Sequence, residues 1–487
     1  MPCTTVLVGK KASYDGSTMI ARNDDGFYDI KKLTVVDPKK VKRKYTSVIG
    51  HLRIELPENP LRYTSTPSVD PKHGIWAANG INEANVAMSA TETITSNPRV
   101  LGADPLVVYK KASKRGEKDI PGGIGEEDLV VLVLPYIRSA REGVERLGEL
   151  LGTYGTYEMN GIAFSDENEI WWLETIGGHH WIAKRVKDED VVIMPNQLGI
   201  DEFDLEDAFN ERKEHLCSAD LREFIKENHL DLNTDGKCNP RNIFGSHSDQ
   251  DHVYNTPRGW YMGRYFCPNT YKWDGEDADF TPESDDIPWA LKPEKKVSVE
   301  DVKYILSSYY QGTPYNPYSK GNEGTKGKYR SIGIARTGTM AVLQIRGYMP
   351  QKLKPLEWIC FGCNAFNTVL PVYTQVSKMP AYISETPLQP STESFYWGSR
   401  LIGALVDPIY GSAIQLVDRY QLSVPSKGHA LVKEYDRKVM ESGDDKLMEE
   451  ANQKICDMAK EETIATLDKV LLESSKAMKC NYNRADN

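Results

Sequence analysis

The residue best suited to do chemistry is a cysteine close to the start of the chain. Cys3 stands at the head of a short apolar run that reaches Val8. A cysteine that begins a mature chain carries both a thiol, with an ordinary pKa of about 8.5, and an α-amine, with one of about 7.7–8.0. Near neutral pH the amine can accept the thiol proton, so one residue can serve as nucleophile and general base. The alternative is a small buried hydrophobe, which is the commoner role of a cysteine at such a position.

Charged residues follow the second apolar run of the chain. The runs Val6–Val8 and Thr18–Asn23 are separated by a turn with Asp15 and Gly16, which predicts a β-hairpin. Arg22 and Asp25 would then lie at the end of the second strand, where a sheet commonly presents its functional groups. A solvated turn with a surface ion pair is the other interpretation of these two residues.

Further candidates lie in the middle of the chain. Asn196 follows the apolar run Val191–Met194, and its carboxamide is a group that an oxyanion hole can use, although turn chemistry alone also explains an asparagine there. The pair His179 and His180 could suggest a metal, but neighbouring strand residues face opposite sides of a sheet. We therefore expect no metal and no cofactor.

The cysteines indicate reduced thiols. Eight are scattered through 487 residues without a secretory signal, so no disulfide framework is expected. Cys360 and Cys363 have the spacing of a redox motif or of half a zinc site, but no second pair accompanies them. Their apolar, strand-like surroundings favour buried structural cysteines.

Composition narrows the class of protein. The chain has 40% hydrophobic and 27% charged residues and a formal net charge of −10, which argues against nucleic acid as a partner. No run of 18 uninterrupted apolar residues occurs, so we expect no transmembrane helix, no membrane partner and a cytoplasmic location. A homo-oligomer is left open.

Alternating apolar patterns predict many short strands joined by turns, and 3.6-residue periodicity predicts helices between and after them. We expect one amphipathic helix over 128–151 and helical structure around 203–228, 395–406 and about 430–477. Strands are expected at 33–36, 74–83, 86–93, 161–164, 169–174, 180–183, 191–194, 329–337, 340–346 and 357–361, of which the run from 161 to 194 reads as an antiparallel meander.

These elements predict a layered α+β domain with two packed antiparallel sheets. Residues 198 to about 328 break the pattern and read as a long insertion that could form one wall of a cleft. We divide the chain into a main domain, 3–430, and a C-terminal helical extension, 431–487.

The chain resembles the C69 dipeptidases, the dipeptidase A group related to secernins. The likeness begins with Cys3–Ser13 and Ile20–Asp25 and extends over most of the chain. Further matching segments are Tyr254–Arg258, Arg336–Thr337 with Val342–Arg346, Phe361–Gly362 with Ala365–Asn367, and Trp397 with Arg400–Ile402. The resemblance implies the αββα sandwich of N-terminal-nucleophile hydrolases and metal-free hydrolysis of dipeptides.

The resemblance also assigns roles to residues. It makes Cys3 the nucleophile and places Arg22 near the thiolate and Asp25 near the α-amine, in the R-x-x-D pattern of more distant relatives, the choloylglycine and penicillin V amidases. Asn196 matches their oxyanion asparagine by position. A late arginine is also recurrent there, for which Arg330 is the first choice and Arg336 the second.

One feature departs from the family pattern: Met1 and Pro2 precede Cys3, so both must be removed before the cysteine has a free amine.

Two alternatives to a dipeptidase stay open. One is a secernin-like protein that keeps the fold and serves regulation or binding, and the other is an amidase for bile-acid or penicillin V conjugates.

Overall fold

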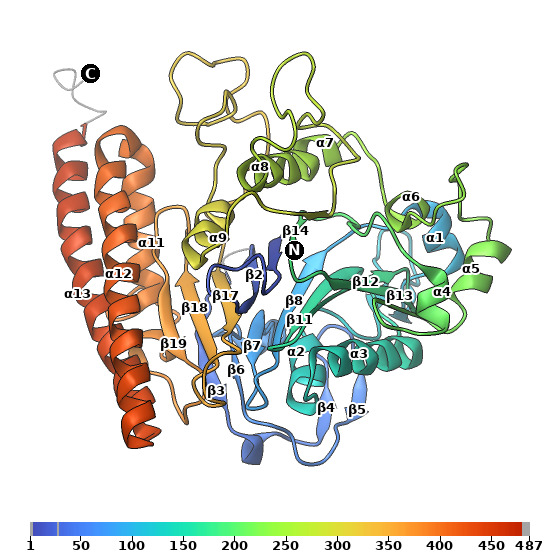
Figure 1. Ribbon diagram of the computed structural model, residues 1–487, viewed down its shortest axis with the longest axis horizontal. Helices are drawn as coiled ribbons and strands as arrows, with labels where there is room; N and C mark the ends of the chain where they lie inside the picture. Colours follow the sequence, from blue (N-terminus) through green and yellow to red (C-terminus); the bar gives the residue numbers. More distant parts are fainter. Residues whose placement is uncertain (1–2, 27–28, 480–487) are drawn as a thin grey trace.

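The computed structural model describes residues 3–26 and 29–479, and two antiparallel β-sheets form its centre (Figure 1). The first has seven described strands in the order β16 (Ala290–Leu291), β14 (Val191–Met194), β1 (Cys3–Val8), β2 (Thr18–Asp24), β17 (Thr339–Ile345), β18 (Pro355–Phe361) and β19 (Leu370–Tyr373). The second has six, in the order β15 (His215–Cys217), β13 (His180–Val186), β12 (Ile170–Ile176), β11 (Asn160–Ser165), β8 (Ala87–Thr93) and β7 (Asn79–Ile81).

Three small two-stranded sheets complete the described β-structure. They are β3 (Thr34–Val36) with β6 (Tyr63–Ser65), β4 (Lys44–Thr46) with β5 (Arg53–Glu55), and β9 (Val108–Lys110) with β10 (Ile120–Pro121).

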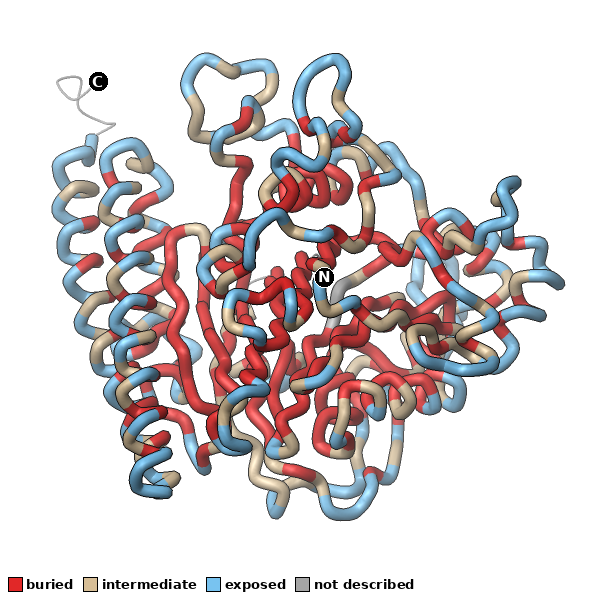
Figure 2. The backbone as a smooth tube through the Cα atoms, viewed as in Figure 1, coloured by how far each residue is buried: buried red, intermediate tan, exposed pale blue. Residues whose placement is uncertain are grey.

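The two large sheets pack face to face, and helices cover their outer sides. Strands β1 and β2 contact β8, and β2 also contacts β11. Helix α3 (Ala140–Tyr154) lies on β11, β12 and β13, whereas α9 (Val299–Leu306) lies on β1, β2 and β17. The buried residues are concentrated in the strands between these helices (Figure 2). This arrangement confirms an α+β protein with packed antiparallel sheets.

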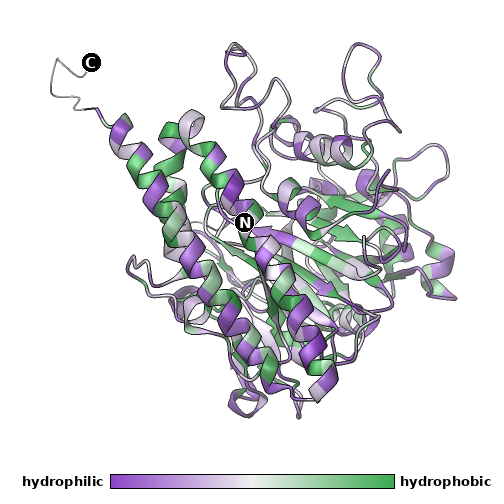
Figure 3. Cartoon of the chain, turned by 60° about the vertical axis from the view of Figure 1, so that its left-hand side comes forward, coloured by the Kyte–Doolittle hydropathy of each residue, from purple (hydrophilic) through white to green (hydrophobic). Residues whose placement is uncertain are grey.

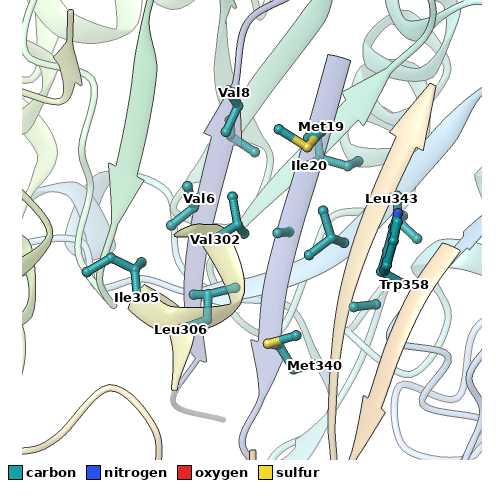
Figure 4. Packing of buried hydrophobic residues seen from close by; sticks show 14 of the residues in the cluster. Val6, Val8, Met19, Ile20, Val302, Ile305, Leu306, Met340, Leu343 and Trp358 are labelled. Carbon is teal, nitrogen blue, oxygen red and sulfur yellow. The ribbon is translucent and has the colours of Figure 1, made fainter. Parts of the chain in front are cut away.

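The contact between α9 and the first sheet shows why the N-terminal strand is fixed. Val302, Ile305 and Leu306 of α9 face the side chains of Val6 and its neighbours (Figure 4). All of these residues are buried. Burial of an aliphatic side chain contributes about 1.5–3 kcal/mol, so this contact holds β1, and with it Cys3, in place.

The remaining helices follow the chain around this centre. They are α1 (Pro98–Ala103), α2 (Leu129–Val133), α4 (Leu205–Phe209), α5 (Leu221–Glu227), α6 (Pro240–Phe244), α7 (Asp251–Tyr254), α8 (Thr256–Phe266), α10 (Ala381–Ser384), α11 (Phe395–Val406), α12 (Tyr410–Ser442) and α13 (Lys446–Ala477).

Helices α12 and α13 form an antiparallel pair that packs on α11 and β19, and polar and apolar residues alternate along both of them (Figure 3). The single helical segment predicted from about 430 to 477 is therefore wrong in its bounds. Gly443 ends α12 with a positive φ of 69°, which a glycine adopts without steric cost. The division of the chain at 430/431 stays a prediction.

By length and composition, one helical stretch of the described chain, Phe395–Ser442, could cross a membrane, although no such stretch was expected. It comprises α11 and α12, and 28% of its most apolar window is buried. Both helices pack on α13.

Three more expectations need correction. The helix predicted over 128–151 is divided into α2 and α3 by a 3₁₀ turn, Leu134–Tyr136. Pro135 in that turn has no N–H to continue an α-helix. The side chain of Ser139 then caps α3 by accepting a hydrogen bond from the N–H of Glu142 at 3.1 Å.

The predicted meander is correct only for its first three strands. β11, β12 and β13 are neighbours, but β14 leaves for the other sheet and pairs with β1 between Thr5–Met194 and Val8–Val191. All four residues of β14 are buried and apolar, as is typical of a strand covered on both faces.

The strand predicted over 329–337 is a loop. Its backbone bonds to neighbouring segments instead of a sheet, with the N–H of Arg330 donating to the carbonyl of Val253 and that of Gly333 to Ser308. The sheet resumes with β17 at Thr339, and the predicted hairpin of β1 and β2 is confirmed.

Candidate functional site

Cys3 begins β1 and is completely buried. In the antiparallel pair with β2, Cys3 is opposite Asp24 and Thr5 is opposite Arg22. Side chains of paired residues share a face, and every second residue of a strand returns to that face. The hairpin register therefore brings Arg22 and Asp24 to the side of the sheet on which the Cys3 thiol lies.

The guanidinium of Arg22 lies against that thiol. Its Nη1 is 3.5 Å from Sγ of Cys3 and 3.4 Å from Oε1 of Glu126, and its Nη2 donates to the carbonyl of Ala78 at 3.3 Å. Arg22 and Glu126 are both almost completely buried. A cation held beside a cysteine favours the thiolate over the thiol.

Asp24 lies in the same group. Lys31 contacts it at 3.0 Å and Arg22 at 3.8 Å. Burial disfavours a charged carboxylate, but the two cations outweigh it and hold the pKa of Asp24 below its usual range. Asp24 is therefore ionised at neutral pH.

Asn196 contacts the backbone of Cys3 rather than its thiol. The N–H of Cys3 donates to Oδ1 of Asn196 at 3.1 Å, and Nδ2 of Asn196 donates to the carbonyl of Thr93 at 2.8 Å. Asn196 reaches this place because it follows β14, the direct neighbour of β1. The structure thus brings the Asn196 side chain to the backbone nitrogen of Cys3.

Arg258 of α8 completes this side of the site, and it was missed as a candidate. It is fully buried, and its Nη1 donates to the Cys3 carbonyl at 2.5 Å and to the hydroxyl of Thr4 at 2.6 Å. Its Nη2 donates to Oδ1 of Asn196 at 2.8 Å and to Oδ1 of Asn255 at 2.7 Å. The sequence could have pointed to Arg258, since Tyr254–Arg258 is one of the segments that resemble the C69 dipeptidases. Glu126 was also missed, because it lies in a segment with no motif.

Asp25 and Arg330 form a buried ion pair one residue beyond β2. Asp25 also accepts a hydrogen bond from the hydroxyl of Thr337 at 2.6 Å. Arg336 lies further out and donates to the Tyr254 hydroxyl at 3.4 Å. Of the two late arginines, Arg330 is therefore the one that contacts a predicted site residue, Asp25.

Comparison with known proteins places this site in a family. The model of peptidase family C69 matches residues 2–423. The chain belongs to this family. A protein named dipeptidase from Bifidobacterium longum (strain NCC 2705) is 57% identical over 449 residues, which cover 91% of this chain and 84% of the relative.

Two other C69 relatives match at similar length. Probable dipeptidase A from Streptococcus pyogenes serotype M3 (strain SSI-1) is 49% identical and covers 100% of both chains. Dipeptidase A from Lactobacillus helveticus is 44% identical, with 90% of this chain and 88% of the relative covered. These matches confirm the resemblance drawn from the sequence.

Three side chains of this C69 site have the donor types of a metal centre. The ligand atoms of Cys3, Asp24 and Glu126 lie within 4.8 Å of one another. Arg22 already contacts all three residues at 3.4–3.8 Å. The guanidinium of Arg22 thus already provides a positive charge for these three groups and would disfavour a metal cation between them.

The histidine pair lies elsewhere and has another partner. Nδ1 of His179 is 3.0 Å from one oxygen of Asp104, and Nδ1 of His180 is 2.7 Å from the other. The argument from strand alternation does not hold for this pair, because His179 belongs to the turn before β13 and both rings reach Asp104.

Cys360 and Cys363 are buried, and none of the seven described cysteines forms a disulfide. Cys480 lies outside the described residues. Burial raises the pKa of the Cys360 thiol to about 12 and that of the Cys363 thiol to about 11. Both stay protonated at neutral pH, as expected of structural cysteines.

Proposed function

We propose that the protein is a dipeptidase whose nucleophile is the thiol of Cys3. Two considerations support this. Three relatives named dipeptidase or probable dipeptidase are 44–57% identical to the chain over 84–100% of their own length. In the structure, Arg22, Asn196 and Arg258 converge on the thiol, nitrogen and carbonyl of Cys3. The contact between Asn196 and the Cys3 nitrogen is the observation that carries the proposal.

The proposal requires removal of Met1 and Pro2, which lie outside the described residues. The nitrogen that now donates to Asn196 then becomes the α-amine and keeps the same neighbour. Such an amine can accept the thiol proton, since the two groups belong to one residue. The sandwich of two sheets between helices is the scaffold that we assign to this N-terminal-nucleophile chemistry.

The reaction proceeds in two steps. The Cys3 thiolate attacks the scissile carbonyl, and the amine returns the proton to the leaving amino acid as the peptide C–N bond breaks. Water then hydrolyses the thioester. Nδ2 of Asn196 has a second hydrogen besides the one donated to Thr93, and we assign it to the oxyanion together with a backbone N–H. Asp25 and Arg330 position the end of β2.

A panel of dipeptides tests this proposal. The wild-type chain should release free amino acids from dipeptides, and Cys3→Ala should abolish the release while the thermal unfolding transition stays unchanged. Hydrolysis by Cys3→Ala at the wild-type rate would remove Cys3 from the mechanism. A wild-type chain that hydrolyses no dipeptide would favour the binding protein or, if it cleaved bile-acid or penicillin V conjugates, the amidase.

A further inference from the structure

Carboxylates surround the Cys3 thiol on the side that faces the second sheet. Ligand oxygens of Asp24 and Glu126 and the Sγ of Cys3 all lie within 4.8 Å of one another. Both carboxylates are at most 3% exposed. Buried charge of this kind is costly unless a cation accompanies it.

A third carboxylate stands behind Glu126. Oε1 of Glu158 accepts a hydrogen bond from the N–H of Glu126 at 2.6 Å. Burial and the neighbouring charge of Glu126 raise the pKa of Glu158 to about 7. No ion pair in the described part of the chain involves Glu158. Three buried carboxyl groups, those of Asp24, Glu126 and Glu158, therefore lie close together here.

Two buried acceptor atoms beside these carboxylates have no hydrogen-bond donor among the described residues. One is Oδ1 of Asp24, and the other is Oδ1 of Asn160, whose residue is 2% exposed. Asn160 follows Glu158 closely and pairs in the sheet with Thr93, the residue whose carbonyl binds Asn196. Unsatisfied buried acceptors among these carboxyl groups are suited to a ligand that carries several N–H donors.

The substrate itself can supply that ligand. In a peptide, the α-nitrogen of the first residue is two bonds from the scissile carbonyl carbon, or about 2.5 Å away. A nucleophile attacks that carbon from about 3–3.5 Å. A carboxylate within 4.8 Å of the Cys3 sulfur is therefore close enough to reach the α-ammonium of a bound dipeptide.

We propose that Glu126 and Asp24, with Glu158 and Asn160 behind them, bind the α-ammonium group of the substrate's first residue. The inference rests on the proposed function and adds the specificity of the site, namely peptides with a free N-terminus. Each carboxylate accepts from an ammonium whose three hydrogens fit several acceptors. Peptides with a blocked or missing α-amine lose these contacts.

The test compares two substrates that differ only in the α-amine, alanyl-alanine and its deaminated analogue propanoyl-alanine. We expect wild-type kcat/KM to favour alanyl-alanine by roughly 10²-fold, the usual cost of leaving a buried charge without its partner. Glu126→Gln and Glu158→Gln should each reduce this ratio at least about tenfold, because hydrolysis of alanyl-alanine falls and that of propanoyl-alanine stays nearly constant. Ratios within one enzyme are insensitive to the active fraction, so partial misfolding does not imitate the result.

Glu149→Gln is the matched control, since Glu149 is exposed on α3 and should leave the ratio unchanged. An unchanged ratio in both Glu126→Gln and Glu158→Gln, or an equal fall for both substrates, would overturn the ammonium site while leaving the dipeptidase proposal intact. If the wild-type chain hydrolysed neither substrate nor any other dipeptide, the proposed function would fail, and the inference with it.

Discussion

The N–H of Cys3 donates a hydrogen bond to the carboxamide oxygen of Asn196, although 193 positions separate the two residues in the chain. Strand pairing produces the contact, because β1 and β14 are neighbours and Asn196 lies two residues beyond the end of β14. The oxygen of Asn196 thus faces the Cys3 nitrogen, and its Nδ2 is the donor that can serve an oxyanion.

Two substitutions of Asn196 test the role of its N–H donor. Asn196→Asp keeps an oxygen acceptor for the Cys3 nitrogen but lacks the N–H donor, whereas Asn196→Ala lacks both. Loss of one oxyanion donor typically lowers kcat about 10²–10³-fold. We expect both variants to lose about that much in steady-state dipeptide hydrolysis. Wild-type kcat in Asn196→Asp would show that the donor takes no part.

Arg258 should be needed for both activity and stability. Its guanidinium satisfies acceptors on Cys3, Thr4, Asn196 and Asn255 while fully buried. Arg258→Lys cannot reproduce this fork of donors. We expect kcat to fall at least tenfold and the free energy of unfolding by about 2–4 kcal/mol, since each unsatisfied buried acceptor costs about 1–3 kcal/mol.

Denaturant unfolding and dipeptide hydrolysis measure the two effects of Arg258→Lys. Arg222→Lys is a suitable control, because Arg222 forms an exposed ion pair with Glu206. An Arg258→Lys variant as active and stable as this control would contradict the assigned role.

Arg22 should govern the reactivity of the Cys3 thiol. The guanidinium lies 3.5 Å from Sγ and favours the thiolate. In Arg22→Gln, the rate of Cys3 alkylation by iodoacetamide at pH 7 should fall about tenfold, and the pH at which the rate is half-maximal should move upward. Peptide mapping by mass spectrometry identifies the alkylated cysteine. An unchanged rate profile would show that Arg22 acts through structure alone.

Glu357, which lies away from the site, should make the free energy of unfolding depend on pH. It is completely buried, accepts a hydrogen bond from Thr64 at 2.9 Å, and has its pKa raised to about 7 by burial. Because the folded pKa lies above the unfolded value, the folded state binds the proton more tightly. The stability from this proton is fully present below about pH 4.5 and is lost as pH rises through about 7.

Glu357→Gln removes this proton-binding site and keeps the shape of the side chain. Between pH 4.5 and 7, the decline in the free energy of unfolding should be smaller than in the wild type by up to about 3 kcal/mol. Asp128, Glu158 and Glu174 also have pKa values raised to about 7, so part of the decline remains. Urea unfolding across this range measures it, and parallel profiles for the two proteins would refute the assignment.

The sequence predicted the local parts of the fold better than their assembly. The β1–β2 hairpin and α11 depend on nearby apolar patterns and turns, and both are confirmed. The placement of β14 in the other sheet depends on a pairing with β1, which no local pattern encodes. The strand predicted over 329–337 is also wrong. Its local apolar pattern resembles that of a strand, but the segment packs as a loop against distant parts of the chain.

The site shows the same division. Cys3 and Arg22 could be placed together because one hairpin carries both. Glu126, by contrast, reaches the thiol from the segment before α2, and only the folded chain brings it there. Arg258 lay within a recognised segment, but its role depends on the position of α8 above β14, a contact between distant parts of the chain.

The intact mass of protein that hydrolyses dipeptides tests the central claim most directly. If Cys3 acts through its own amine, the mass of the active chain must lack both Met1 and Pro2, so that it begins at Cys3. A fully active preparation whose mass still includes Pro2 would contradict the mechanism.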